Sequence, residues 1–116
     1  MPDTQTSLEV RRPNEATGLV AVRGELTGAT EGPLMDAYGQ ASDALTRMIV
    51  LDFTELEYMN STGIGLLVTL LVRAQRQRQK LMAFGLSEHY RQILSLTRLD
   101  EAIGVVDSEA DALAAS

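Results

Sequence analysis

The sequence contains no cysteine and a single histidine, and these two absences exclude several kinds of active site. Without cysteine there is no thiolate nucleophile, no cysteine-ligated zinc or iron-sulfur centre and no disulfide. His89 alone cannot form a metal site of several histidines, and a serine-histidine-aspartate arrangement would have to use this one residue. We therefore expect no catalytic residue, no metal and no cofactor, and we expect that the protein is not an enzyme.

Positive charge and long apolar runs are also scarce. The 10 Lys and Arg residues face 16 Asp and Glu residues, which gives a formal net charge of −6 and argues against a nucleic-acid binder. The longest nearly apolar stretch, Gly63 to Val72, covers 10 residues, whereas a membrane span needs about 20. The first ten residues have neither the basic start nor the apolar centre of a secretory signal. We expect a cytoplasmic protein that does not insert into a membrane.

The length of 116 residues fits one globular domain, which we assign to residues 1–116 with a flexible N-terminus at residues 1–7. Alternation around Leu8 and Val10, followed by turn residues and a second apolar stretch at residues 19–23, predicts a β-hairpin. We expect a monomer or a weak dimer.

Strands and helices alternate after the hairpin. Short apolar runs predict strands at residues 48–51, 81–84 and 103–106. Helices are predicted over residues 30–45, 60–79, 87–97 and 108–113, the first capped by Thr30 and burying Leu45. The predicted order is ββαβαβαβα. It implies an α/β fold whose mixed, mainly parallel sheet carries an N-terminal antiparallel hairpin and helices mainly on one side.

Two hydroxyl residues, Ser61 and Thr62, stand where the longest predicted helix begins. Unpaired backbone N–H groups and the positive end of the helix dipole lie there, so a phosphate is tolerated at this position. The alternative is that Asn60 or Ser61 only caps the helix and that the glycines allow close packing. The segment matches neither a nucleophile elbow nor a dinucleotide fingerprint, so we interpret the hydroxyls as targets of another enzyme. A hydrolase using Ser61 with His89 is a remote alternative.

The predicted long helix is apolar on more sides than one sheet requires. Neighbouring helices or a partner surface could account for the additional apolar residues, which are Leu66, Val68, Leu70 and Val72. Beyond them the helix becomes basic, and we interpret these cations as structural because positive charge suits a helix C-terminus.

Three stretches carry a family resemblance, and they are Gly24-Glu25-Leu26, Ile49-Val50-Leu51-Asp52-Phe53 and Tyr58-Met59-Asn60-Ser61-Thr62-Gly63-Ile64-Gly65. Together they resemble the STAS domain of bacterial anti-sigma factor antagonists, over roughly residues 8–113. In that family the first serine of the motif is phosphorylated by an anti-sigma factor that is also a kinase, and this serine aligns with Ser61. Thr62 is the less favoured acceptor. The chain departs from the family at Asn60 and Thr27, where the family usually has acids.

The resemblance implies a switch. The unmodified protein would bind an anti-sigma serine kinase and release a sigma factor, phosphorylation of Ser61 would end the contact, and a phosphatase would reset it. The implied partner-binding residues are Glu25, Leu26, Thr27, Asn60, Ser61, Thr62, Gly63, Ile64 and Leu66. The alternative is a constitutive scaffold, in a stress-signalling complex or as accessory subunit of a lipid-transporting ABC system. The additional apolar surface and the two missing acids favour it.

Overall fold

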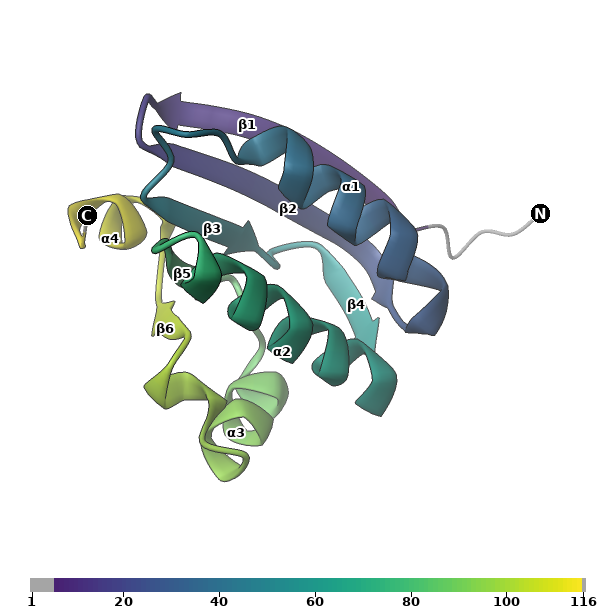
Figure 1. The fold of residues 1–116 in the computed structure, drawn as a ribbon. Coiled ribbons are helices and arrows are strands. Elements are labelled where there is room, and N and C mark those ends of the chain that lie inside the picture. The colour runs from purple at the N-terminus through teal and green to yellow at the C-terminus, as the bar shows by residue number, and fades with distance from the viewer. Residues whose placement is uncertain (1–5, 116) are drawn as a thin grey trace.

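The computed structural model describes residues 6–115 and contains one six-stranded sheet in the spatial order β1-β2-β3-β5-β6, with β4 paired to β2 (Figure 1). The strands are β1 (Ser7–Asn14), β2 (Thr17–Leu26), β3 (Met48–Asp52), β4 (Leu56–Met59), β5 (Lys80–Phe84) and β6 (Gly104–Val106). The helices are α1 (Glu31–Ala41), α2 (Ser61–Arg76), α3 (Glu88–Leu96) and α4 (Glu109–Ala114), with 3-10 turns η1 (Gly28–Thr30) and η2 (Leu99–Glu101). The β1-β2 pair is antiparallel and all other pairs are parallel. The predicted fold class is confirmed.

The sheet is covered on both faces, which explains the continuous apolar runs in its central strands. Successive β3 side chains alternate between two buried clusters. Ile49 and Leu51 join the larger cluster, which contains buried residues of α1, α2 and α3. Met48 and Val50 join the smaller one, which contains Ala112 of α4. Three helices therefore lie on one face and α4 on the other, which matches the prediction of helices mainly on one side.

The first helix is shorter than predicted. It ends at Ala41, and Leu45, predicted to be buried, is 61% exposed. The Asp43 carboxylate accepts hydrogen bonds from the Leu45 N–H and the Thr46 hydroxyl, and this local turn replaces the last helical turn. Thr30 is the N-cap residue of α1, as predicted, but its side chain makes no capping hydrogen bond to that helix and instead accepts one from the Thr27 N–H.

Strand β4 was not predicted. The predicted order has no strand between residues 51 and 60, but residues 56–59 pair with the second half of β2. The ten-residue β2 pairs with β3 through Thr17–Ala21 and with β4 through Gly24–Leu26. The long strand β2 therefore pairs with the two short strands β3 and β4, one after the other along its length. As a result, the chain enters α2 directly beside the end of β2 (Figure 1).

The flexible N-terminus predicted for residues 1–7 lies mainly outside the described residues. Within them, Ser7 pairs with Arg23, and the Thr6 hydroxyl donates to the Glu25 carbonyl at 2.8 Å.

In residues 6–115, the structure contains no helix long and apolar enough to cross a membrane.

Candidate functional site at the start of helix α2

The two segments predicted to bind a partner lie side by side because β2 and β4 are paired. Glu25 is opposite Tyr58, and Leu26 is opposite Met59. The Asn60 N–H then donates to the Leu26 carbonyl at 3.3 Å. The pairing brings residues 25–27 next to the first turn of α2. We call residues 25–29 and 58–65 together the α2-start surface.

Asn60 is the cap of α2. Its side-chain oxygen accepts a hydrogen bond from the Gly63 N–H at 2.8 Å, and its carbonyl accepts one from the Ile64 N–H at 3.0 Å. Of the two caps considered from sequence, the structure therefore selects Asn60. Ser61 becomes the first helical residue, with an exposed side chain whose hydroxyl makes no hydrogen bond within residues 6–115.

Gly63 allows α2 to start this close to β2. A Cβ atom added to Gly63 would lie 2.1 Å from the Leu26 carbonyl oxygen, far inside van der Waals contact. By contrast, a Cβ added to Gly65 would meet nothing within 4 Å. On the other side of the turn, a Cβ added to Gly28 would lie 3.3 Å from the Thr62 methyl group, so Gly28 is also a close neighbour. The two segments touch through small residues and backbone.

Burial divides the predicted partner-binding residues. Ser61 and Thr62 are exposed, and four others are half-buried, namely Glu25, Thr27, Asn60 and Ile64. Leu26 and Leu66 are 0% and 6% exposed and belong to the core, and Gly63 is buried. These three residues lie beneath the surface and support it, and they offer no exposed side chain to a partner.

Sequence reasoning missed Tyr58 as a surface residue. Its side chain is 48% exposed and lies on β4, next to the buried Met59. Strand alternation at this dipeptide was the available signal, but the predicted order has no strand here. Gly28 and Ala29 of η1 are also exposed beside the same turn.

The α2-start surface contains no positive side chain. Residues 24–29 and 56–65 include no Lys or Arg, and their charged residues are Glu25 and Glu57. Arg23 lies just outside, and it is engaged by Glu9 at 2.7 Å and Glu55 at 3.5 Å. The pKa of the Arg23 guanidinium is raised above its usual value, mainly by the hydrogen bond to Glu9. An anion on Ser61 would find backbone N–H groups of the first turn and no free cation in these segments.

Helix α3 supports the surface from a third direction. The Met59 N–H, on the edge of β4 that does not pair with β2, donates to the Tyr90 hydroxyl oxygen at 2.8 Å. His89 is exposed, and its ring centre is 4.9 Å from that of Tyr90. Within residues 6–115 no hydrogen bond joins His89 to Ser61, and no group of three His, Asp or Glu residues could hold a metal ion.

Comparison with known proteins gives the same fold. The family model described as "Mlab, STAS domain" matches residues 9–107. The anti-sigma-B factor antagonist of Listeria monocytogenes is 25% identical over 105 residues, which are 90% of this chain and 92% of that protein. The crystal structure of an anti-sigma factor antagonist from Mycobacterium paratuberculosis superposes with a TM-score of 0.81 at 21% identity, covering 98% of this chain and 96% of that one.

A further similar structure is that of the Bacillus cell fate determinant SpoIIAA in its phosphorylated form. Its TM-score is 0.66 at 17% identity, and the match covers 92% of this chain and 96% of that one. At such identities the two solved structures show the fold, whereas the family model spans most of the chain, from the first strand to the end of β6. The chain belongs to the STAS domain family.

Proposed function

We propose that this protein is an anti-sigma factor antagonist that is switched off by phosphorylation of Ser61. The observation that carries the proposal is the exposed Ser61 hydroxyl in the first turn of α2, next to the end of β2 and without a hydrogen bond to any residue from 6 to 115. The names of its relatives support the class of function, because those reported above include antagonists of anti-sigma factors. The phosphorylated form of SpoIIAA supports a covalent switch in a protein of this fold.

The unmodified α2-start surface suits close contact with a partner. Its exposed residues are small or neutral at Ser61, Thr62 and Gly28, so a partner backbone can approach without displacing long charged side chains. Tyr58 adds an aromatic side chain of the kind enriched in protein interfaces. In the proposed cycle an anti-sigma serine kinase binds here, and the sigma factor it held is released.

Phosphorylation would change this surface locally. The γ-phosphoryl group of ATP moves to the Ser61 oxygen, ADP leaves, and the hydroxyl proton passes to a base of the kinase. The product carries about −1.5 to −2 charges at neutral pH. Glu25 and Glu57 have the same sign, and the segments supply no Lys or Arg to compensate. The N–H groups of the first α2 turn tolerate the new anion, so the partner contact fails while the fold remains. A phosphatase reverses the step by hydrolysis.

Intact mass spectrometry tests the covalent step. The full chain is incubated with the anti-sigma kinase encoded nearest to it and ATP, and we expect one phosphoryl group on the parent and on Thr62→Val. Ser61→Ala should gain none. A parent chain that stays unmodified, or a Ser61→Ala chain that still gains a phosphoryl group, contradicts the assignment.

Copurification separates the switch from the scaffold alternative. Val68 and Val72 on the outer face of α2 are each 40% exposed and offer some apolar surface to a permanent partner. We expect the tagged full chain to recover an anti-sigma kinase. Recovery of a transport ATPase and permease without any sigma regulator contradicts the proposed function and supports the accessory-subunit alternative.

A further inference from the structure

The ten cations of this chain fall into two equal groups. Five form ion pairs with acids, and these are Arg11, Arg12, Arg23, Arg91 and Arg98. The other five have no ion pair with any residue in the range 6–115, and these are Arg47, Arg73, Arg76, Arg78 and Lys80. We call the second group the basic end, because all five lie at one end of the molecule.

The topology of the sheet gathers the basic end. Arg47 directly precedes β3, and Lys80 is the first residue of β5. The Lys80 N–H donates to the Arg47 carbonyl at 2.8 Å. Arg73 and Arg76 lie in the last turn of α2, and Arg78 is in the short turn that connects α2 to β5. In Figure 1 the last turn of α2 lies near the start of β5, while its first turn lies near the tip of β4.

The helix dipole does not account for this grouping. It favours Arg73 and Arg76, which are in the last turn of α2. Arg47, Arg78 and Lys80 lie outside the helix, and Arg78 has a positive φ of 59°, a conformation that favours glycine. The nearby Asp43 is paired with Arg12 at 3.2 Å. Arg47 donates hydrogen bonds to two neighbouring carbonyls, and the Lys80 ammonium donates to the Ala115 carbonyl at 2.8 Å. These neutral acceptors leave all five cations without an acid partner within residues 6–115.

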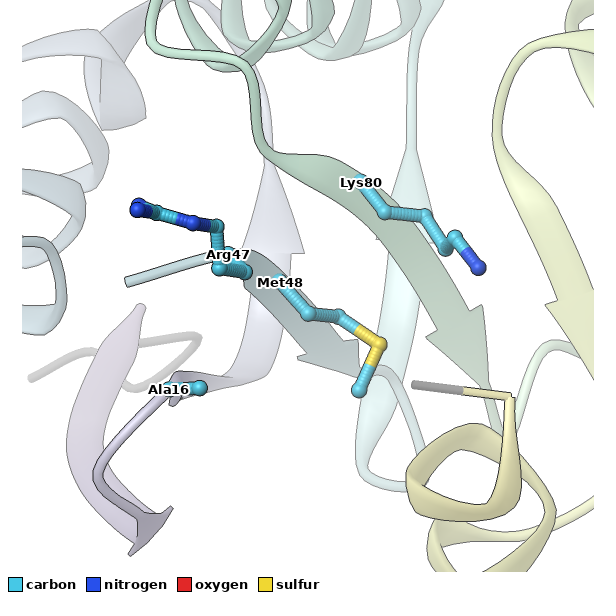
Figure 2. Close-up of a pocket in the computed structure, with 4 residues that line it drawn as sticks. All are labelled: Ala16, Arg47, Met48 and Lys80. Carbon is cyan, nitrogen blue, oxygen red and sulfur yellow. The ribbon is translucent and has the colours of Figure 1, made fainter. Parts of the chain in front are cut away.

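Two hollows at the basic end each have two cations in their walls, and only the first is otherwise lined by apolar side chains. The first, of about 360 Å³, is lined by Ala16, Arg47, Met48 and Lys80, and Figure 2 shows the charged groups of Arg47 and Lys80 on opposite sides of Met48. The second, of about 280 Å³, is lined by Tyr38, Arg73, Arg76 and Gln77. The first hollow fits an apolar side chain between two negative groups, and the arginines of the second fit further negative groups.

We propose that the basic end is a docking surface for an acidic segment of a partner protein, with Asp or Glu residues flanking an apolar residue. Four of the five cations are arginines, whose planar guanidinium groups bind carboxylates through paired hydrogen bonds. The surface is distinct from the α2-start surface, since Ser61 and Arg76 are separated by about 22 Å along the helix at 1.5 Å per residue.

A short acidic segment fits better than an extended polyanion. Without the five positive charges of the basic end, the net charge of −6 becomes −11 for the rest of the chain. A duplex or an anionic membrane that extends past one end of this molecule of 38 × 30 × 24 Å also lies against neighbouring parts of the acidic remainder, whereas a short segment does not. A second copy is a poorer occupant, because three of its five C-terminal acids are already paired, namely Glu101, Asp107 and Glu109.

Titration of the isotopically labelled full chain, followed by nuclear magnetic resonance, tests the proposal. The probe is a short synthetic peptide of Asp and Glu around a central Leu-Phe, and its control has Asn and Gln at the acidic positions. We expect shifts confined to the basic end and its hollows with the acidic peptide, weaker at higher salt, and none with the control. The double variant Arg76→Gln/Arg78→Gln should weaken binding about 2-fold to 30-fold, as for two exposed charge contacts.

The matched control removes the same charge elsewhere. Arg91→Gln/Arg98→Gln changes the net charge equally but leaves the basic end intact, and its affinity should stay within about twofold of the parent's. Thermal unfolding confirms that both double variants are folded. Three results overturn the proposal: no shifts or shifts elsewhere, equal weakening by both double variants, or sedimentation with phosphatidylglycerol vesicles in place of peptide binding. Ser61→Asp should bind the peptide like the parent, so this outcome is independent of the phosphorylation switch.

Discussion

The two ends of α2 are built in opposite ways. At the first turn, backbone contacts are tight, the exposed side chains are short, and neighbouring segments contain no cation. At the last turn, long positive side chains extend without ion pairs within the described range. The ends are about 22 Å apart, well beyond the Debye length of about 8 Å. The cations of one end therefore cannot neutralise a phosphoryl group at the other, and each end can serve a separate contact.

Gly63→Ala should give the largest effect on stability, because its Cβ would overlap the Leu26 carbonyl oxygen. We expect a loss of about 3 kcal/mol in the free energy of unfolding, at the upper end of the range for overpacked sites. Urea unfolding measures it. Gly65→Ala is the matched control, and since its Cβ meets open space, it should be neutral or stabilise by up to about 1 kcal/mol. Equal effects of the two variants would contradict close packing at the first turn.

Asn60→Ala removes the cap from the Gly63 N–H and should lower the free energy of unfolding by about 1 kcal/mol. Asn60→Asp keeps the cap and adds negative charge near the helix start, so its stability should equal or slightly exceed that of the parent. Chemical unfolding of both variants provides the comparison. If alanine is tolerated as well as aspartate, the cap does not stabilise the first turn.

Tyr90→Phe removes the acceptor for the Met59 N–H and should cost up to about 1 kcal/mol. The more specific readout is hydrogen exchange at the Met59 amide, which should accelerate while amides of β3 stay protected. Tyr58→Phe is the control, because the Tyr58 hydroxyl makes no hydrogen bond within residues 6–115. Unchanged exchange at Met59 would show that α3 does not hold β4 in place.

The smallest expected effect lies near the basic end, in the turn before β3. The pKa of Asp43 lies below its usual value, mainly because its carboxylate accepts a hydrogen bond from the Leu45 N–H. The hydrogen bond from the Thr46 hydroxyl and the charge of Arg12 lower it further. A depressed folded-state pKa means that the stabilisation is complete above the unfolded-state value of about 3.9 and is lost as the pH falls through the folded-state value. Carboxyl chemical shifts should show Asp43 titrating below an unperturbed aspartate. Asp43→Asn should remove this acid sensitivity, and an ordinary pKa at Asp43 would contradict the turn geometry.

The sequence predicted the elements whose signal is local. Continuous apolar runs located β3 and β5 because both faces of the sheet are covered, and the hydroxyl pair at Ser61 was correctly placed at a helix start. Strand β4 escaped prediction because its pairing depends on the length of β2, which is a tertiary property. Leu45 was misassigned because the Asp43 turn competes with helix continuation.

The candidate site was predictable in position more than in detail. The resemblance selected two segments that the structure places side by side, but it could not show that Leu26 and Leu66 point into the core. The cations near residue 76 were visible in the sequence. That none of them forms an ion pair within the described range could not be predicted, because the fold decides which arginines lie next to acids.

The most direct test compares the affinity of the phosphorylated and unmodified chains for the anti-sigma kinase, measured by calorimetry, with an amide spectrum of each chain. We predict that phosphorylation at Ser61 weakens binding by at least about tenfold, which corresponds to about 1.4 kcal/mol. We also predict spectral changes confined to the α2-start surface. Equal affinity of the two chains, or loss of the native spectrum on phosphorylation, would contradict the account of a local charge switch on an unchanged fold.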